Sequence, residues 1–511
     1  MTRDAAAAAA FHSATGGQGL SDRTWRDLAL DAVFARLDRC ATAIGAQVLY
    51  ARLRGAPVAS ELDADAEMRR FDRRVRAFGE VDARRRFERA VKPLAAERSA
   101  ALAPVLFRDA PALPRGARMF PVATALTFAA AVASAVWPLA LLVFVGLVLG
   151  NIALRLHLHP FMTAHADALA TVASLVAAAE KVAAIDALGD DARTLRAAVA
   201  AVAPWRRSLT WATLDARGLD EVAASLIAYV NVFFLVDVNA FVASLRLLRA
   251  RGAALRTLFT VAGDLDAARA VALFRAENAH AVPSFLPPGA PIVMTAMRHP
   301  LVAGAVPNDV RIDARGWLVL GSNASGKSTC LKGIALQVVL AQSIATVTCE
   351  RYAAPPLRVR TLIHVEDDVE GGRSHFQVEA EAVRDMLCED DECDEYDKCA
   401  HKDRLCVVDE LFRGTNTAER VAAGAAVLRG LHRRGARVLA ATHDDELIAR
   451  LARDFDPFYF AERVEGAALA FDYLLRAGRA APRNAIAVLE LTGVPADVIA
   501  DARTENRMTG G

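Results

Sequence analysis

Apolar residues recur at three- and four-residue spacing along two long parts of the chain, residues 22–102 and 157–279. This spacing gathers apolar side chains on one face of a helix. After Pro291 the pattern changes to short apolar runs, such as 317–320 and 405–408, which are separated by helical stretches. Short buried strands that alternate with helices are typical of an α/β domain. The pattern therefore predicts an all-helical N-terminal part and a C-terminal α/β domain.

The segment 120–154 has no charged residue, and Pro138 lies in its middle. About 20 apolar residues suffice for one membrane-spanning helix, and a proline inside a helix bends or breaks it. Three structures fit: one long tilted span, a hairpin of two short helices that turns near Pro138, or a helix pair buried in a soluble protein. Arg118 and Arg155 flank the segment, and positive flanks favour the cytoplasmic side. A hairpin keeps both flanks there, so we expect a transmembrane hairpin over residues 119–155.

Composition limits the classes of protein that fit. The 511 residues include 61 Lys and Arg against 60 Asp and Glu, a net charge of +1. This balance argues against a surface coated in basic residues for nucleic acid, although it allows a local basic groove. Seven cysteines in such a chain do not indicate a secreted disulfide scaffold, and the alanine run at 5–10 is too short for a signal-peptide core. We therefore expect the protein on the cytoplasmic face of the inner (cell) membrane or, as the alternative, in the cytoplasm.

A glycine-rich loop follows the first apolar run of the α/β part, and its spacing G-x-x-x-x-G-K-[ST] is that of a phosphate-binding loop. A predicted strand precedes the loop and a predicted helix follows it, so backbone N–H groups at the helix start can point at an anion. Lys327 is expected to contact the β- and γ-phosphates of ATP, and Ser328 to ligate Mg²⁺. The ATP-binding residues predicted from this motif are Gly321, Ser322, Asn323, Ala324, Ser325, Gly326, Lys327, Ser328 and Thr329.

Two further predicted strands end in residues suited to phosphoryl transfer. Asp409 and Glu410 follow one strand, and His443 follows the next. A carboxylate at the end of a buried strand can hold Mg²⁺, so Asp409 takes that role. The adjacent Glu410 is placed to act as general base on the attacking water. His443 is expected to sense the γ-phosphate or to hold the water, so Lys327, Glu410 and His443 are the predicted catalytic residues of an ATPase.

These residues lie in longer segments that resemble the MutS family of DNA mismatch-repair proteins. The run DELFRGTNT from Asp409 is similar to the family's signature after its acidic pair, and ATHDDEL from Ala441 is similar to its Thr-His-x-x-Glu-Leu segment. The run SHFQVE from Ser374 resembles the segment between the two Walker motifs. Residues 31–53 look like the start of the MutS helical core. The resemblance implies an ABC-type P-loop ATPase domain that follows a helical core or lever domain.

The resemblance also implies a second subunit. In the family, the serine that matches Ser374 is presented to the nucleotide of the opposite subunit, so we expect a homodimer in which Ser374 acts in trans. The helical core begins near residue 20, so we expect a short member that lacks the mismatch-recognition domain. The phosphate loop has Ala324 and Ser325 where repair proteins usually carry Met-Gly, a change that keeps the backbone N–H groups. We therefore expect nucleotide binding without mismatch-specific reading of DNA.

A cysteine-containing acidic segment lies between the serine segment and the acidic pair. Seven acidic residues fall between 389 and 397, and the spacing C-x₄-C-x₅-C around them is not that of standard zinc knuckles. An exposed acidic loop with incidental cysteines is the preferred interpretation, and a metal or redox site is the alternative. The ligands of a zinc site would be Cys388, Cys393, Cys399 and His401.

The sequence thus predicts a dimeric, membrane-associated ATPase that couples ATP turnover to conformational change, with an unknown protein partner. The alternative is a DNA-binding ATPase that acts in repair, or on branched or damaged DNA, through its helical core. The expected domains are a disordered tail at 1–20, a MutS-core-like helical region at 21–118, the transmembrane hairpin at 119–155, a helical lever at 156–285, the ATPase domain at 290–503 and a tail at 504–511.

Overall fold

The computed structural model describes residues 5–17, 19–55, 61–95, 97–108, 112–205, 221–322, 325–363, 375–388, 403–412, 416–465, 468–479 and 494–509. Contacts divide the chain into two compact units. Unit 1 comprises residues 1–18, 36–52 and 71–274, and unit 2 comprises residues 19–35, 53–70 and 275–511. The chain alternates between the two units before residue 71, so both units include N-terminal residues.

The described secondary structure of unit 1 consists of helices and turns, in agreement with the three- and four-residue spacing of the sequence. The boundary between the units passes through α3 (Leu30–Leu37) and α5 (Glu61–Ala77), and the last residues of α4 and α13 also belong to unit 2. The other helices of unit 1 are α1 (Ala5–Ala14), α4 (Ala43–Arg54), α6 (Val81–Val91), α7 (Leu102–Phe107), α8 (Phe120–Ala133), α9 (Pro138–Val182), α10 (Gly189–Val202), α12 (Glu221–Phe234) and α13 (Val236–Glu277), with 3₁₀ turns at Lys92–Leu94, Glu97–Ala101, Asp186–Leu188 and Ala203–Trp205.

Both expected tails are largely helical, so the prediction of a disordered residue 1–20 segment was wrong for α1. The Phe11 ring packs against Phe107 and Phe259, with ring centroids 4.8 and 5.2 Å away. Burial of this aromatic ring stabilises a helix that alanines alone would hold only weakly. At the other end, α19 (Ala496–Thr509) extends through most of the segment expected to be loose.

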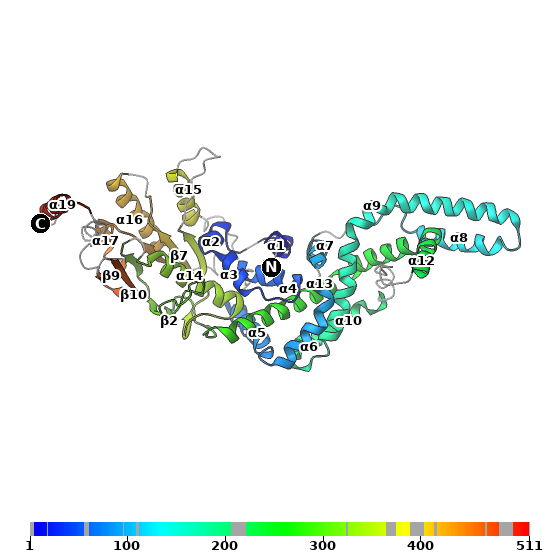
Figure 1. The fold of residues 1–511 in the computed structure, drawn as a ribbon, viewed down its shortest axis with the longest axis horizontal. Helices are drawn as coiled ribbons and strands as arrows, with labels where there is room; N and C mark the ends of the chain where they lie inside the picture. The colour runs from blue at the N-terminus through cyan, green and yellow to red at the C-terminus, as the bar shows by residue number, and fades with distance from the viewer. Residues whose placement is uncertain are drawn as a thin grey trace. The chain divides into compact units, whose positions relative to one another are not determined.

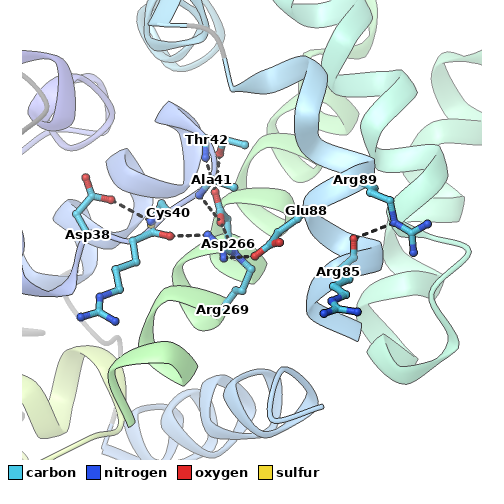
Figure 2. A network of polar contacts seen from close by, with 10 residues as sticks. Asp38, Cys40, Ala41, Thr42, Arg85, Glu88, Arg89, Asp266 and Arg269 are labelled. Atoms are coloured by element: carbon cyan, nitrogen blue, oxygen red, sulfur yellow. Dashed lines mark hydrogen bonds and ion pairs between the residues drawn. The ribbon is translucent and has the colours of Figure 1, made fainter. Parts of the chain in front are cut away.

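A buried carboxylate joins α4 to α13 within unit 1 (Figure 2). Asp266 on α13 is fully buried and accepts hydrogen bonds from the backbone N–H groups of Ala41 and Thr42 and from the Thr42 hydroxyl, at 2.8–2.9 Å. These donors lie just before α4, where helix N–H groups lack intrahelical partners and a negative charge is favourable. Arg269 lies 3.2 Å from Asp266 and donates to Glu88 at 2.7 Å. The carboxylate therefore caps α4 from a helix more than 200 residues away in the chain.

Helix α13 contains one residue with non-helical backbone angles. Arg251 has φ −129° and ψ 22°, which divides the 42-residue helix into two arms. Val238 and Val242 on the first arm pack with Phe120 and Leu158 at the base of α8 and α9. The second arm carries Asp266 and the contacts to α4. Arg251 thus separates two differently packed halves of one helix.

The charge-free segment forms two helices, α8 and α9, that lie side by side with a turn at residues 134–137 (Figure 1). Pro138 takes the first position of α9, where its missing N–H has no cost. The break rules out one uninterrupted helix over 120–154. Helix α12 packs against both helices. Residues 138–165 of α9 are long and apolar enough to cross a membrane. An 18-residue window within them has a mean hydropathy of 2.3, and only 6% of that window is buried.

Unit 2 contains strands that alternate with helices, as its short apolar runs predict, and the strands form two β-sheets. The strands of the larger sheet lie in the order β10-β9-β4-β8-β7-β6, and all neighbours are parallel except β10 and β9. The smaller sheet has the order β1-β5-β2-β3. The strands are β1 (Ser284–Phe285), β2 (Ile292–Met297), β3 (Asn308–Ile312), β4 (Gly316–Leu320), β5 (Arg351–Ala354), β6 (Arg358–Leu362), β7 (Arg404–Asp409), β8 (Ala436–Ala441), β9 (Phe455–Glu465) and β10 (Ala468–Ala477).

Helices pack against the larger sheet and bury its central strands. Every residue of β4 and β8 is buried, which explains their continuous apolar runs. Helix α14 packs on β6, β7 and β8, and α16 packs on β8. Asp27 on α2 accepts hydrogen bonds from the Thr361 hydroxyl and the Ile363 N–H at the end of β6. The helices of unit 2 are α2 (Asp22–Asp27), α14 (Lys327–Ile344), α15 (His375–Cys388), α16 (Thr417–Arg433), α17 (Asp445–Leu451) and α19.

Candidate nucleotide-hydrolysis site

The glycine-rich loop lies between β4 and α14, in the strand–loop–helix setting that the motif requires. Gly321 and Gly326 have φ values of 143° and 103°, which side-chain-bearing residues rarely adopt. A Cβ atom at Gly321 would lie 2.6 Å from the Ser325 hydroxyl, and one at Gly326 would lie 3.1 Å from the Tyr473 ring. Gly326 is the N-cap of α14. The loop backbone therefore leads directly into a helix N-terminus, where N–H groups favour an anion.

Lys327 begins α14 and lies within the loop. Its side chain is 5% exposed, and its Nζ donates to the carbonyl oxygens of Gly321 and Ser322 at 2.6 and 3.0 Å. The same Nζ lies 3.9 Å from Glu410 Oε1. A buried ammonium needs such oxygen partners because burial without them is costly. The loop and β7 therefore hold the positive charge of Lys327 at the centre of the site.

Ser328 and Asp409 meet across the start of α14 and the end of β7. The Ser328 hydroxyl donates to Asp409 Oδ2. The other carboxylate oxygen, Oδ1, is buried and has no hydrogen-bond partner among the residues that the structure describes. A buried carboxylate oxygen without a donor is costly unless a cation balances it, and Mg²⁺ prefers oxygen ligands of this kind. The pair therefore fits a magnesium ion.

Glu410 and His443 follow neighbouring parallel strands at the same edge of the sheet. Asp409 at the end of β7 pairs with Ala441 at the end of β8, which brings the loops after the two strands together. Glu410 Oε1 lies 3.5 Å from His443 Nδ1. Glu410 has φ 49°, and its N–H donates to the Ala441 carbonyl at 3.1 Å. A non-glycine residue in this conformation is strained and often marks a functional site. A cavity of about 20 Å³, enough for about one water, lies beside both side chains.

The segment after the acidic pair is held by a glutamate that the sequence analysis did not assign a role. Glu379 on α15 is 3% exposed, and its Oε1 accepts a hydrogen bond from the Phe412 N–H at 2.6 Å. The Phe376 ring lies 5.4 Å from the Phe412 ring. Phe412 itself has φ 61°. The Phe-x-x-Glu spacing was the available signal, and its effect is to fix the backbone that follows Glu410.

Several predicted residues lie outside the described ones. They are Asn323, Ala324 and Ser374, together with Cys393, Cys399 and His401 of the possible zinc site, while Cys388 is the last residue of α15. The described residues contain no group of three or more His, Cys, Asp or Glu side chains that could hold a metal ion. The structure therefore brings together Lys327, Ser328, Asp409, Glu410 and His443, and leaves the remaining residues as predictions.

His299, which precedes α14 in the chain, predicts a pH effect on stability. Burial and, to a smaller extent, the charge of Lys332 lower its pKa from 6.5 to about 4. Its Nδ1 accepts a hydrogen bond from the Leu301 N–H, so the folded protein holds a neutral ring. In the unfolded chain His299 takes up a proton below pH 6.5, whereas in the folded chain it does so only below about pH 4. The contribution of His299 to the free energy of unfolding is therefore fully present above pH 6.5 and is lost as the pH falls toward 4. Its upper limit is about 3 kcal/mol, and the partial exposure of the ring to solvent reduces it.

Urea denaturation of the full chain at pH 7 and pH 4.5 checks this expectation. A His299→Gln variant should lose less stability between the two pH values than the unmodified protein, because its side chain cannot take up the proton. Equal losses in both proteins would show that His299 titrates normally in the folded state.

The C-terminal part of the chain is similar to known proteins. A family model described as MutS domain V matches residues 317–509. The DNA mismatch repair protein MutS of Thermus aquaticus is 34% identical over 254 residues, which cover 49% of this chain and 30% of that protein. That of Sorangium cellulosum is 33% identical over 58% of this chain and 33% of the protein, and DNA mismatch repair protein MutS 2 of Halobacterium salinarum is 36% identical over 40% and 24%. The matched region thus spans a third or less of these relatives. Residues 317–509 thus match MutS domain V, and about half of the chain is similar to part of the DNA mismatch repair proteins named MutS.

Proposed function

We propose that this protein binds and hydrolyses ATP, to ADP and phosphate, in an ABC-type P-loop domain. The observation that carries the proposal is the meeting of Lys327, Ser328, Asp409, Glu410 and His443 at one edge of the larger sheet. In this proposal the loop N–H groups and Lys327 bind the phosphates. Mg²⁺ held by Ser328 and Asp409 would neutralise charge on the phosphate oxygens. The first test is Mg²⁺-dependent release of phosphate from ATP by the purified chain.

Glu410 is placed to take the proton of the attacking water. Its carboxylate lies between the Lys327 ammonium and the His443 ring, at 3.9 and 3.5 Å. A positioned carboxylate that accepts a proton in the transition state is the function of a general base. His443 is 56% exposed and can hold the same water from the other side. The strained backbone at Glu410 supports this role, because it fixes the direction of the side chain.

We further propose a homodimer in which Ser374 completes the nucleotide site of the opposite subunit. Lys327→Ala and Ser374→Ala proteins should each hydrolyse ATP poorly alone. In a mixed dimer, the Ser374→Ala subunit keeps Lys327 and receives Ser374 from its Lys327→Ala partner, so one of two sites is complete. A statistical mixture is half mixed dimers, so about a quarter of the unmodified activity should return.

The mixing experiment requires subunit exchange, which two affinity tags and sequential purification of the mixed dimer establish. A mixture of Lys327→Ala with Glu410→Gln serves as the matched control. Each of these changes affects the site of the subunit that carries it. Both sites of the mixed dimer are therefore incomplete, and it should stay inactive. If the Ser374→Ala mixture is equally inactive although mixed dimers form, Ser374 does not act in trans.

DNA is the partner that the comparisons favour for this ATP cycle. The curated relatives are named DNA mismatch repair proteins. Arg73, Arg85 and Arg89 are exposed on α5 and α6 and could contact phosphates; Arg85 and Arg89 appear in Figure 2. Binding through phosphates weakens steeply with salt. Affinity for duplex and branched DNA, measured between low and physiological salt with Arg85→Glu and Arg89→Glu variants, tests this candidate.

A further inference from the structure

The surface of α8, α9 and α12 reverses the usual distribution of side chains. We use the term apolar tip for residues 120–154 and 222–236, two runs without a charged residue. Large apolar side chains of the tip are exposed, including Trp137 (68%), Leu139 (78%) and Leu142 (70%). A soluble protein rarely exposes a contiguous apolar surface, and a core helix would be buried instead. The tip therefore needs an apolar environment that the described chain does not supply.

Several polar side chains of the tip form hydrogen bonds between its helices. Asn151, 4% exposed, donates to the Thr127 hydroxyl at 3.0 Å and to the Phe233 carbonyl at 2.7 Å. The Thr124 hydroxyl donates to the Phe234 carbonyl at 2.7 Å. Hydrogen bonds between helices with apolar side chains outside are the arrangement of helices packed in lipid, where every polar group must find an internal partner. Together with the exposed apolar side chains, this pattern favours a tip that faces lipid.

Charged residues mark where the apolar surface ends. Arg155 and Asp237 are the first charged residues after the two runs, and they pair with each other at 2.8 Å. Arg118 precedes the tip and, with Arg246, lines a cavity of about 680 Å³ at its base. Arginines at this level suit the phosphates of lipid headgroups. The 17 residues of α9 from Pro138 to Leu154 span about 26 Å, close to the hydrocarbon thickness of about 30 Å.

We propose that the apolar tip inserts into a lipid bilayer, with the pair Arg155–Asp237 at the headgroup boundary and Trp137 deep in or across the hydrocarbon. The exposed apolar side chains of the tip would thus contact lipid acyl chains. Insertion takes place from the cytoplasmic face of the cell membrane; only this orientation rests on the proposed function, because ATP is a cytoplasmic substrate. Insertion itself does not depend on nucleotide hydrolysis.

Flotation of the full chain with lipid vesicles tests the proposal. Protein purified in detergent is reconstituted with phosphatidylcholine and phosphatidylglycerol vesicles and centrifuged through a density gradient. The protein should float with the vesicles and stay with them after an alkaline carbonate wash. A Leu142→Arg/Leu149→Arg variant should float at least tenfold less, because a charge in the hydrocarbon is unfavourable. Its ATP hydrolysis in detergent should remain unchanged, which shows that it is folded.

Matched controls place an arginine at exposed apolar residues outside the tip. Val81 and Val302 are 52% and 44% exposed, and Val81→Arg and Val302→Arg should float like the unmodified protein. Lipids brominated on their acyl chains should quench Trp137, and a Trp137→Phe protein should lose that quenching. The proposal is overturned if the protein stays soluble without detergent and does not float. It is also overturned if the double arginine variant floats normally but changes its oligomeric state, since the tip would then bind a second copy of the chain.

Discussion

Replacement of Glu410 by Gln is expected to lower the rate of ATP hydrolysis by about two to four orders of magnitude, the usual contribution of a general base. The amide keeps the shape of the side chain and cannot accept the proton of the water. ATP should still bind, because the loop, Lys327 and the pair of Ser328 and Asp409 remain. The variant is therefore expected to hold ATP without turnover.

Single-turnover phosphate release and equilibrium binding of ATP separate these two effects. Glu419→Gln is the matched control, because Glu419 is an exposed glutamate in the first turn of α16 in the same domain. It should hydrolyse ATP at the unmodified rate. Undiminished hydrolysis by Glu410→Gln would remove Glu410 as the base and direct attention to His443.

Replacement of Asp266 by Ala is expected to have the largest effect on local stability. The change removes the acceptor of three hydrogen bonds at the start of α4, which come from the N–H groups of Ala41 and Thr42 and from the Thr42 hydroxyl. It also removes a carboxylate beside Arg269, which is 5% exposed. Loss of one partner from a buried ionic network typically costs about 3–5 kcal/mol, a large part of the 5–15 kcal/mol that holds a typical domain together.

Hydrogen exchange of the full chain measures this effect where it arises. Amides of α4 should exchange about a hundredfold or more faster in Asp266→Ala, because their protection reports the local free energy of opening. Peptides from β4 and β7 should keep their protection. Asp82→Ala breaks only the exposed ion pair with Arg86 and should cost less than about 1 kcal/mol. Unchanged exchange of α4 in Asp266→Ala would show that the capping of this helix does not depend on the carboxylate.

The parts of the fold that the sequence predicts are those with local causes. The run 317–320 and the loop after it predict β4, the phosphate loop and α14. A strand buried on both faces requires a continuous apolar run, and the loop conformation requires glycines, so both are visible within a few residues of sequence. Pro138 likewise predicts the turn between α8 and α9. Local patterns therefore identified both the strand–loop–helix unit and the hairpin.

The parts that the sequence did not predict have distant causes. Asp266 caps a helix more than 200 residues away, and Glu379 holds the backbone at Phe412 from another helix. The helix α1 forms because Phe11 meets Phe107 and Phe259. None of these partners is adjacent in sequence, so no period or motif in a single sequence indicates them.

The kink at Arg251 also has a mechanical meaning. The first arm of α13 packs at the base of the apolar tip, and the second arm is fixed to α4 by Asp266 and by close backbone approach, since a Cβ at Gly263 would lie 2.4 Å from the Val48 side chain. Neither arm can slide on its neighbours without breaking these contacts, so within α13 a change in angle falls at Arg251. Helix α9 also joins the tip to the rest of unit 1, where it packs on α6 and α10, and it contains Pro160, which weakens the helix at that point. A change in the tilt of the tip, as a membrane of different thickness would require, therefore needs bending at Arg251 and at Pro160 together.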